Sequence, residues 1–285
     1  MKILVTGVGG PAGRRVSELL LAEGYRVSGA DMQEAAFAGL EDFYKAPAAQ
    51  SDGYLPWLAM VVEDFDLVIP TVQEELPIVA AEKILFPCRF LVGSRDAVVI
   101  AQDKYLTVQS LTSAGVPVPR SALPSTVNSA EEVSARLGWP CLSKPRSSRG
   151  GRNVTVYDGR DDYPLLATLD NTYILQEFAP GPEYTVNLFV EDDQETVVVL
   201  EKTALREGRT GNALGVRRVL SIDIAETAVQ AARAIGLTGP MDMDIRRRAD
   251  GTPLVLEINA RFGANITHAP EILKAALQSK LVHSC

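Results

Sequence analysis

The first thirty residues alternate between apolar runs and polar, glycine-containing turns. Ile3 to Val5 form a short apolar run, and TGVGGPAG follows over residues 6–13. Residues 14–23 then place apolar side chains at helical spacing, which predicts an amphipathic helix. Gly24 ends this helix, and residues 25–30 resume an extended run. The opening therefore predicts a strand, a glycine turn, a helix and a second strand.

The same alternation continues to about residue 95. Short apolar runs at 67–70 and 90–93 read as strands, and a helical pattern over 74–85 lies between them. Strands that alternate with helices are typical of a parallel sheet with helices on both faces. The pattern predicts a Rossmann-like α/β domain over residues 1–95.

Beyond residue 95 the pattern changes to helices that alternate with hairpins, which predicts an α+β domain over residues 96–285. Helical patterns cover residues 104–113, 129–137 and 225–235. Strand pairs are predicted for residues 141–144 with 153–157, 183–190 with 196–203, and 241–247 with 253–259. No internal repeat is present in the sequence.

Composition narrows the class of protein. The 285 residues are 46% hydrophobic and 22% charged, which fits an ordinary globular protein of two domains. A net charge of -8 disfavours nucleic acid as a partner. Three cysteines and two histidines suit neither a disulfide framework nor a four-ligand zinc site. With no apolar run long enough for a signal peptide or a membrane span, we expect a cytoplasmic protein with no membrane partner.

The glycine turn is the first candidate site. Gly7, Gly10 and Gly13 have the spacing of a dinucleotide-binding turn, and Asp31 follows the second strand where a ribose-binding acid would lie. An NAD(P)-dependent reductase or epimerase is therefore one hypothesis. Many doubly wound domains need the same tight turn without a dinucleotide. In addition, no tyrosine has a lysine four residues later, as a short-chain reductase would require.

The second candidate is the hairpin near the C-terminus. Side chains alternate along a strand, so Asp242 and Asp244 share one side of it, as do Glu257 and Asn259 on the partner strand. If Asp250 and Gly251 form a two-residue turn, Asp244 lies opposite Glu257 and Asp242 opposite Asn259. A four-residue turn keeps the same face, whereas a three-residue turn would set Asp244 beside an apolar residue. The four oxygen-bearing side chains either line a solvated face or hold a hard cation such as Mg²⁺.

Two further segments are candidates for nucleotide binding. Lys144 precedes SSRGGRN, whose hydroxyls and backbone N–H groups suit a phosphate chain but lack Walker spacing. In QEFAPGPEYTV from Gln176, an extended backbone could bond an adenine edge, and Glu183 could accept from a ribose. An exposed basic hairpin tip and a plain strand crossover are the structural alternatives.

Taken together and in order, these segments resemble the ATP-grasp superfamily, in particular carboxylate-amine ligases near the carbamoyl phosphate synthetase large chain. The resemblance covers nearly the whole chain. It rests on the opening glycine turn, the Lys144 loop, and the three segments LVGSRDAVVIAQDKYLTVQSLTSAGVPVP, QEFAPGPEYTV and DGTPLVLEINARFG. It implies a Rossmann-like pre-ATP-grasp domain over residues 1–95 and an ATP-grasp domain over 96–285 with a mobile lid over about 115–180.

The resemblance also implies a set of site residues. ATP contacts are expected from Lys104, Lys144, Gly150, Gly151, Gln176, Glu177, Phe178 and Glu183. Asp244, Glu257 and Asn259 match the ligands of Mg²⁺ or Mn²⁺, and Arg261 and Lys202 are the candidate catalytic residues. Lys202, Arg206 and Arg218 flank a glycine-bearing segment that either orders on substrate or is a solvated basic loop.

The implied activity is the ATP-dependent joining of a small, amino-acid-like carboxylate to an amine through an acyl phosphate, with release of ADP and phosphate. Such chemistry needs charge neutralisation and alignment rather than a covalent nucleophile, which fits the absence of a Ser-His-Asp or Cys-His set. Ser148, Asn153 and Ala264 depart from the family pattern and bear on the lid geometry. The chain continues only about twenty residues past the last motif, so an ATP-binding subunit completed by a partner chain, or a homo-oligomer, is the alternative.

Overall fold

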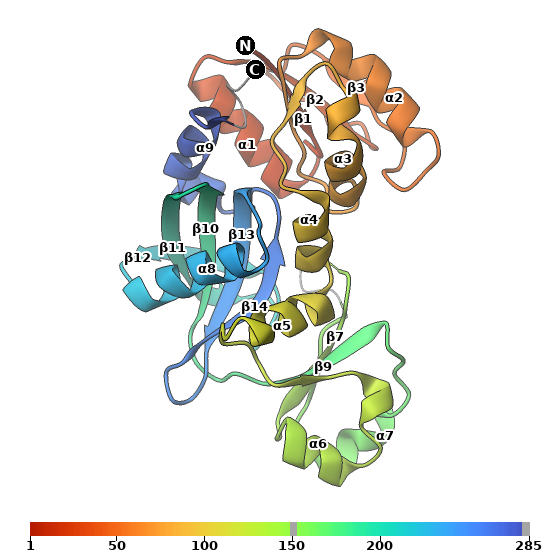
Figure 1. The fold of residues 1–285 in the computed structure, drawn as a ribbon, viewed down its shortest axis with the longest axis vertical. Helices are drawn as coiled ribbons and strands as arrows, with labels where there is room; N and C mark the ends of the chain where they lie inside the picture. The colour runs from red at the N-terminus through yellow and green to blue at the C-terminus, as the bar shows by residue number, and fades with distance from the viewer. Residues whose placement is uncertain (149–152, 281–285) are drawn as a thin grey trace.

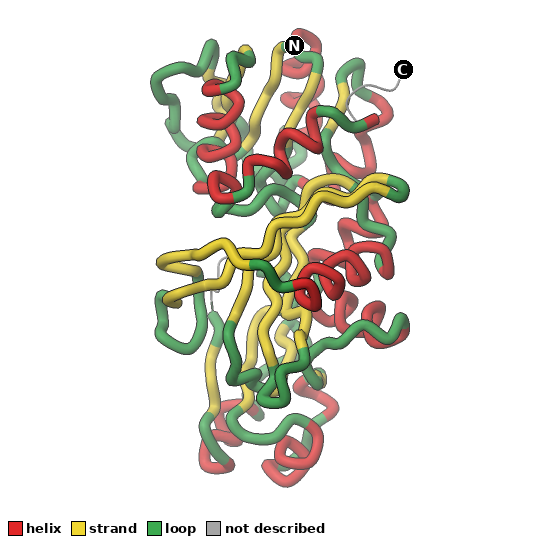
Figure 2. Tube along the Cα trace, turned by 90° about the vertical axis from the view of Figure 1, so that its left-hand side faces the viewer, coloured by secondary structure: helices red, strands yellow, loops and turns green. Residues whose placement is uncertain are grey.

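The structure is a computed structural model that describes residues 1–148 and 153–280 (Figure 1). Gly150 and Gly151, two of the predicted phosphate-binding residues, lie outside the described residues. Three sheets follow one another along the longest axis of the molecule (Figures 1 and 2). They are called the N-terminal, central and third sheet below.

The N-terminal sheet is parallel and has the strand order β3-β2-β1-β4-β5. Its strands are β1 (Lys2–Thr6), β2 (Arg26–Asp31), β3 (Phe43–Lys45), β4 (Leu67–Ile69) and β5 (Arg89–Phe90). The connecting helices are α1 (Pro11–Ala22), α2 (Tyr54–Val61) and α3 (Leu76–Glu82). The strand order reverses between β1 and β4. The loops after these two strands therefore run in opposite directions, and the space between them can hold a ligand.

Apolar side chains on both faces explain why β1 is a continuous apolar run. Ile3 and Val5 pack in one core cluster with Val16 and Leu20 of α1, whereas Leu4 packs in another cluster on the opposite face. Gly7 follows β1 with a φ of 69°, a backbone conformation that side chains disfavour. The predicted strand, turn, helix and strand are therefore confirmed in this part of the chain.

The central sheet is antiparallel and has the order β12-β11-β10-β13-β14. Its strands are β10 (Glu183–Glu191), β11 (Gln194–Leu205), β12 (Ala213–Val219), β13 (Gly239–Arg247) and β14 (Pro253–Asn259). One face is apolar and packs on α8 (Ile222–Ala234), with α4 (Arg95–Gln102) and α5 (Lys104–Ser113) also against β14. The other face carries polar side chains at its centre, and α9 (Pro270–Leu277) covers its far end (Figure 1).

The third sheet has the order β6-β9-β7-β8 and a small core of its own. Its strands are β6 (Ser121–Ala122), β7 (Cys141–Pro145), β8 (Thr155–Tyr157) and β9 (Tyr173–Glu177). The helices α6 (Ala130–Arg136) and α7 (Tyr163–Leu166) pack beside it, away from the N-terminal sheet (Figure 1).

Most elements agree with the sequence-based predictions. The three predicted hairpins are present, and α5 has the predicted bounds. The helix predicted over 74–85 begins only at Leu76 and ends in a 3-10 turn, and α2, α4, α7 and α9 were not predicted. The domain boundary at residue 95 and the lid over 115–180 stay predictions. No helix in the described ranges could cross a membrane.

Candidate functional site

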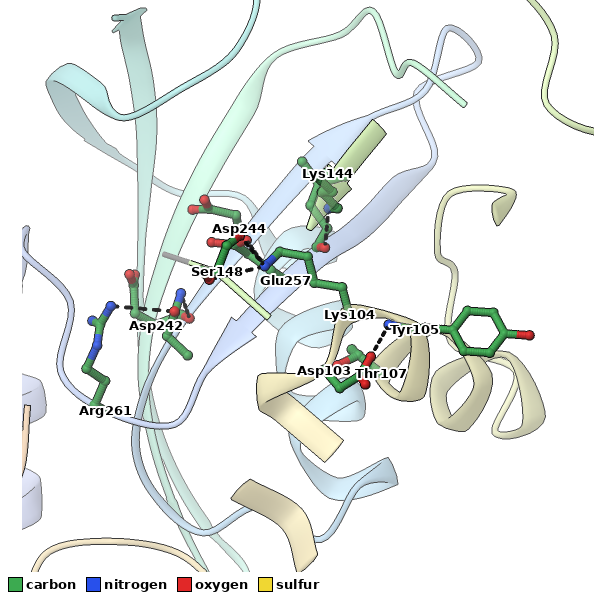
Figure 3. Close-up of polar contacts among 12 residues, drawn as sticks. Asp103, Lys104, Tyr105, Thr107, Lys144, Ser148, Asp242, Asp244, Glu257 and Arg261 are labelled. Carbon is green, nitrogen blue, oxygen red and sulfur yellow. Dashed lines mark hydrogen bonds and ion pairs between the residues drawn. The ribbon is translucent and has the colours of Figure 1, made fainter. Parts of the chain in front are cut away.

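Four oxygen-bearing side chains meet on the polar face of the central sheet. Asp242 pairs with Asn259 and Asp244 with Glu257 in the ladder between β13 and β14 (Figure 3). On the other side, β10 sets Thr185 opposite Asp244. The predicted register of this hairpin and its shared polar face are confirmed. The four side chains and Thr185 are called the acidic face.

The two-residue turn at Asp250 and Gly251, from which this register was predicted, is not present. Beyond Asp244 the pairing shifts by one, so that Ile245 faces Val255 and Leu256 is left without a partner strand residue. The loop between the strands therefore has an odd number of residues, and a β-bulge at Leu256 restores the face that the loop alone would have changed. The carbonyl of Leu256 accepts a hydrogen bond of 2.9 Å from Lys144 Nζ. The bulge thus also positions a lysine.

Three buried lysines surround the acidic face. Lys104 Nζ lies 3.4 Å from Glu257 Oε2 and also donates to Ser148 (Figure 3). Lys202 Nζ lies 2.6 Å from Glu183 Oε1 and 2.8 Å from Asp244 Oδ1. The side chain of Lys202 is only 5% exposed. The interpretation of this segment as a solvated basic loop is therefore wrong for Lys202, which belongs to the core of the site.

The first turn of α5 fixes Lys104. Asp103 caps the helix by accepting from the N–H groups of Tyr105 and Leu106. Arg146, just after β7, binds Asp103 at 2.6 Å, and its carbonyl accepts from the N–H of Lys104. One cap therefore connects α5 to the strand that carries Lys144.

The charges of this cluster shift the pKa values in opposite directions. Burial disfavours the charged form of Glu257, but Lys104 and Lys144 outweigh burial and lower the pKa of Glu257 to about 2. Burial raises the pKa of Asp244 to about 7 and lowers the pKa of Lys144 to about 8. Burial also raises the pKa of Asp242. The protein holds Glu257 ionised, and burial brings the pKa values of Asp244 and Lys144 close to neutral pH.

The donor chemistry of the acidic face fits a hard cation. Asp244, Glu257 and Asn259 offer only oxygen ligands, as Mg²⁺ or Mn²⁺ prefers. Within residues 1–148 and 153–280, no group of three His, Cys, Asp or Glu side chains is gathered as a ready metal site. The two carboxylates instead engage Lys104 and Lys202. Arg261 donates to the carbonyl of Phe262 at 2.8 Å and reaches Asn259 Oδ1 at 3.5 Å (Figure 3).

The predicted adenine-binding segment joins the third sheet to the central sheet. Gln176 is buried at the end of β9, and its Nε2 has no hydrogen-bond partner among the described residues. The carboxylate of Glu177 binds Arg120 and Arg248. The ring of Phe178 has Arg246 at 4.8 Å from its centroid.

Glu183, the predicted ribose-binding residue, is buried and contacts two cations. Its Oε1 binds Lys202 and its Oε2 lies 3.3 Å from Arg246. The structure therefore connects Glu183 to the acidic face through Lys202.

A cavity of about 1290 Å³ connects the acidic face to the N-terminal sheet. The acidic face lines it on one side, and the glycine turn lines it on the other. Asp31 Oδ2 accepts from the N–H of Gly9 at 2.9 Å, so this carboxylate holds the turn. Tyr54, Gln73 and Glu75 also line the cavity, and the sequence-based predictions missed all three. The rule that ligands bind beyond the carboxyl ends of parallel strands could have indicated the loop after β4.

Comparisons with known proteins agree with this geometry. A family model described as an ATP-grasp domain matches residues 101–265. The D-alanine–D-alanine ligase of Cupriavidus taiwanensis is 30% identical over 181 residues, 58% of this chain and 55% of that protein. The carbamoyl phosphate synthase large chain of Rubrobacter xylanophilus is 26% identical over 66% of this chain and 19% of its own length. The matched region thus spans about half of the first relative.

Solved structures share the fold over almost the whole chain. The L-amino acid ligase from Bacillus licheniformis superposes with a TM-score of 0.73 at 18% sequence identity, over 98% of this chain and 74% of that one. The superposition includes all three sheets, so known proteins share the whole mixed α/β fold.

Proposed function

This chain belongs to the ATP-grasp family, and from that premise we propose that it is an ATP-dependent ligase that joins a carboxylate to an amine through an acyl phosphate. The observation that carries the proposal is the convergence of Lys104, Lys144 and Lys202 on the acidic face at one side of a large cavity. Such a site offers cations to a polyphosphate and leaves space for two further substrates.

The polar contacts suggest where ATP would lie. Lys104 and Lys144 would contact its phosphates, because both are buried cations beside carboxylates that a bound phosphate chain and cation would engage instead. Gln176 to Phe178 would meet the adenine, since the unpartnered Gln176 amide needs a hydrogen-bonding group. Glu183 would accept from the ribose, and Lys202 would then turn from Glu183 to a phosphate.

A metal ion would be held by Asp244, Glu257 and Asn259. Bound there, Mg²⁺ would neutralise the phosphate charge that builds up during transfer. The low pKa of Glu257 keeps that ligand ionised well below neutral pH. The remaining coordination would come from phosphate oxygens and water, since this set supplies only two carboxylates and one amide.

The chemical steps need alignment and charge rather than a nucleophile from the chain. A carboxylate oxygen of the acid attacks the γ-phosphorus, the bond to the bridging oxygen breaks, and ADP leaves. The amine nitrogen then attacks the acyl carbon, an N–H proton is lost to solvent, and phosphate leaves with the former carboxylate oxygen. Arg261 is near enough to the acidic face to stabilise the charge of the transferring group.

The substrates are proposed to be small and amino-acid-like. Support comes from the names of the relatives, since a D-alanine–D-alanine ligase and an L-amino acid ligase both join amino acids. We further propose that the N-terminal sheet is a Rossmann-like domain that helps bind the second substrate. The third sheet would form the lid over residues 115–180 that excludes water from the acyl phosphate.

The test is phosphate release from ATP and Mg²⁺ with pooled amino acids and small carboxylates, each with and without added amines. Glu257→Gln should lower acid-dependent release by about a hundredfold or more while ATP binding changes by only a few fold. Glu195→Gln is the matched control, because this exposed glutamate on β11 forms an ion pair with Arg233 and does not line the cavity. Unchanged release in Glu257→Gln would reject the metal-ligand role. A thermal shift by ATP but not NAD, with no release, would favour a subunit that needs a partner chain.

A further inference from the structure

The end of the cavity opposite the acidic face lies where the strand order of the N-terminal sheet reverses. Thr6 ends β1, and Thr71, Gln73 and Glu75 follow β4, the neighbouring strand. Thr71 is bonded back to Thr6, since its hydroxyl donates to the Thr6 carbonyl. Open parallel sheets bind ligands at this kind of switch point. All four residues line the cavity.

Glu75 is a buried carboxyl group with neutral partners only. It is 2% exposed and accepts hydrogen bonds from the hydroxyls of Thr6 and Tyr54 and, at 3.0 Å, from the N–H of Val72. No ion pair reaches Glu75 in the described part of the chain. Buried carboxylates are normally paired with a cation, because neutral donors only partly offset the loss of water. A cation bound in the cavity would supply the positive charge that Glu75 lacks.

Gln73 is the second unusual group at this end. The residue is 8% exposed, and its Oε1 is buried without a hydrogen-bond partner among the residues described. The side chain of Gln102 donates to the Gln73 carbonyl and so fixes the backbone. An unpaired buried amide oxygen is unfavourable, because it has lost its hydrogen bonds to water without gaining others. A donor brought by a ligand would satisfy it.

The charge of this end of the cavity selects the kind of ligand. Asp31, Glu34 and Glu75 line it, and no lysine, arginine or histidine of the first 95 residues does. The rings of Tyr54 and Trp57, whose centroids lie 5.6 Å apart, add aromatic faces that attract cations. Among the lining residues of the first 95, a phosphorylated or other anionic group would find no cationic side chain, and the positive partners there would be peptide N–H groups at the start of α1.

We propose that Gln73 and Glu75 form a binding site for the ammonium group of a substrate, with Gln73 accepting a hydrogen bond and Glu75 supplying the negative charge. This inference rests on the proposed ligase function. Burial raises the pKa of Glu75, and a cation beside the carboxylate would offset that effect. The ammonium group belongs either to the amino acid that donates the acyl group or to the amine that accepts it. In the second case the ammonium first loses a proton to solvent and leaves Glu75, because only the neutral amine has the lone pair that attacks the acyl carbon.

Direct binding tests the site without the reaction. A pool of amino acid amides, which are cationic, and a pool of C2 to C6 monocarboxylates, which are anionic, are titrated against the chain and followed by thermal shift. The amides should bind and the monocarboxylates should not. Gln73→Leu and Glu75→Gln should each weaken the amides by about tenfold or more. Glu63→Gln, an exposed glutamate outside the cavity, should change nothing.

Gln73→Leu separates a binding role from a structural one. Replacing an unpaired buried amide by an apolar side chain of similar size should leave the unliganded chain as stable or more stable. A folded Gln73→Leu variant that binds the amides as tightly as the parent would overturn the proposal. A larger thermal shift with the monocarboxylates than with the amides would overturn it as well.

Phosphate release then identifies which substrate carries the ammonium group. N-acetyl amino acids have a carboxylate and no ammonium, so they can only donate the acyl group. If they support release and Glu75→Gln raises the amine concentration that this release requires, the site serves the acceptor. If free amino acids support release and N-acetyl amino acids do not, the site serves the donor. Amide binding that is lost in Glu75→Gln, in a parent that releases no phosphate with any pool, would reject ligase activity of this chain on its own and keep the ammonium site.

Discussion

The cavity has a half-buried glutamate, Glu257, at one end and a buried one, Glu75, at the other, and the two are stabilised in different ways. Glu257 lies among Lys104, Lys144 and Lys202, whose charges lower its pKa to about 2. Glu75 is held by two hydroxyls and one peptide N–H, and burial raises its pKa. The first carboxylate is ionised by the protein itself, whereas the second is left in need of a cation.

This difference indicates that the two ends of the cavity bind different kinds of ligand. At the acidic face, a phosphate chain and a cation can exchange partners with existing ion pairs, so charge is rearranged rather than created. At the switch point, binding adds the missing charge. The same residue type thus serves a nucleotide at one end and, in our proposal, an ammonium group at the other.

The largest expected effect comes from removing a cation at the acidic face. Lys202→Met removes the shared partner of Glu183, which is buried, and of Asp244, which is half-buried, and this should lower the free energy of unfolding by about 3–5 kcal/mol. Urea unfolding at pH 7 measures it. The matched control is Lys280→Met, because Lys280 and its partner Asp192 are 75% and 67% exposed and such pairs contribute about 1 kcal/mol or less. An equal decrease in the free energy of unfolding in both variants would show that the ion pairs of Lys202 contribute no more than an exposed pair.

Glu257→Gln should remove a stabilisation that depends on pH. Because the folded pKa is lowered to about 2 from an unfolded value near 4.3, the contribution is present above about pH 4.3 and is lost as pH falls toward 2. The shift corresponds to roughly 3 kcal/mol at pH 7. Urea unfolding from pH 3 to 7 should show parent and variant converging toward the acid end. A constant gap would contradict the pairing with the lysines.

Glu75→Gln should show the opposite slope. Its folded pKa is raised, so the contribution of the bound proton is fully present below about pH 4.3 and is lost as pH rises through the folded pKa. The glutamine keeps its acceptor oxygen at all pH values. The parent should therefore lose stability relative to the variant between pH 4 and 8, by about 1.4 kcal/mol for each unit of pKa shift. Parallel pH profiles would show that Glu75 is not perturbed.

The acidic face was largely predictable from sequence because it depends on local rules. Side chains alternate along β13 and β14, and one hairpin brings the two strands together, so the pattern predicted that Asp244 and Glu257 share a face, and the bulge at Leu256 preserves that face despite the odd-numbered loop. Lys104 and Lys144 were found through the order of motifs. The bulge at Leu256 was not predictable, since a single displaced residue depends on how the loop and the neighbouring strands fit.

The switch-point site was missed because its residues are far apart in the sequence. Thr6 ends β1, Tyr54 begins α2 and Glu75 directly precedes α3, and no spacing connects the three residues. Their contact follows from the strand order, in which β4 lies beside β1. The partner of Lys202 was likewise hidden, because the pairing of β10 with both β11 and β13 brings Glu183, Lys202 and Asp244 together.

The smallest expected effect concerns the hydroxyl that Tyr54 donates to Glu75. Tyr54→Phe removes one of three donors and leaves the ring in place, so the free energy of unfolding should fall by about 1 kcal/mol when Glu75 is protonated. Above the folded pKa the loss should grow to about 2 kcal/mol, because hydrogen bonds to a charged group are stronger.

Urea unfolding of Tyr54→Phe at pH 4 and pH 8 measures this growth, and Tyr25→Phe, whose hydroxyl has no hydrogen bond among those in the described residues, is the control. If the amide pool is added at pH 8, the extra loss should shrink, because a bound ammonium group then stabilises the ionised carboxylate in place of the hydroxyl. A loss that is the same at both pH values, with and without the amides, would mean that Glu75 carries no charge that a ligand could use.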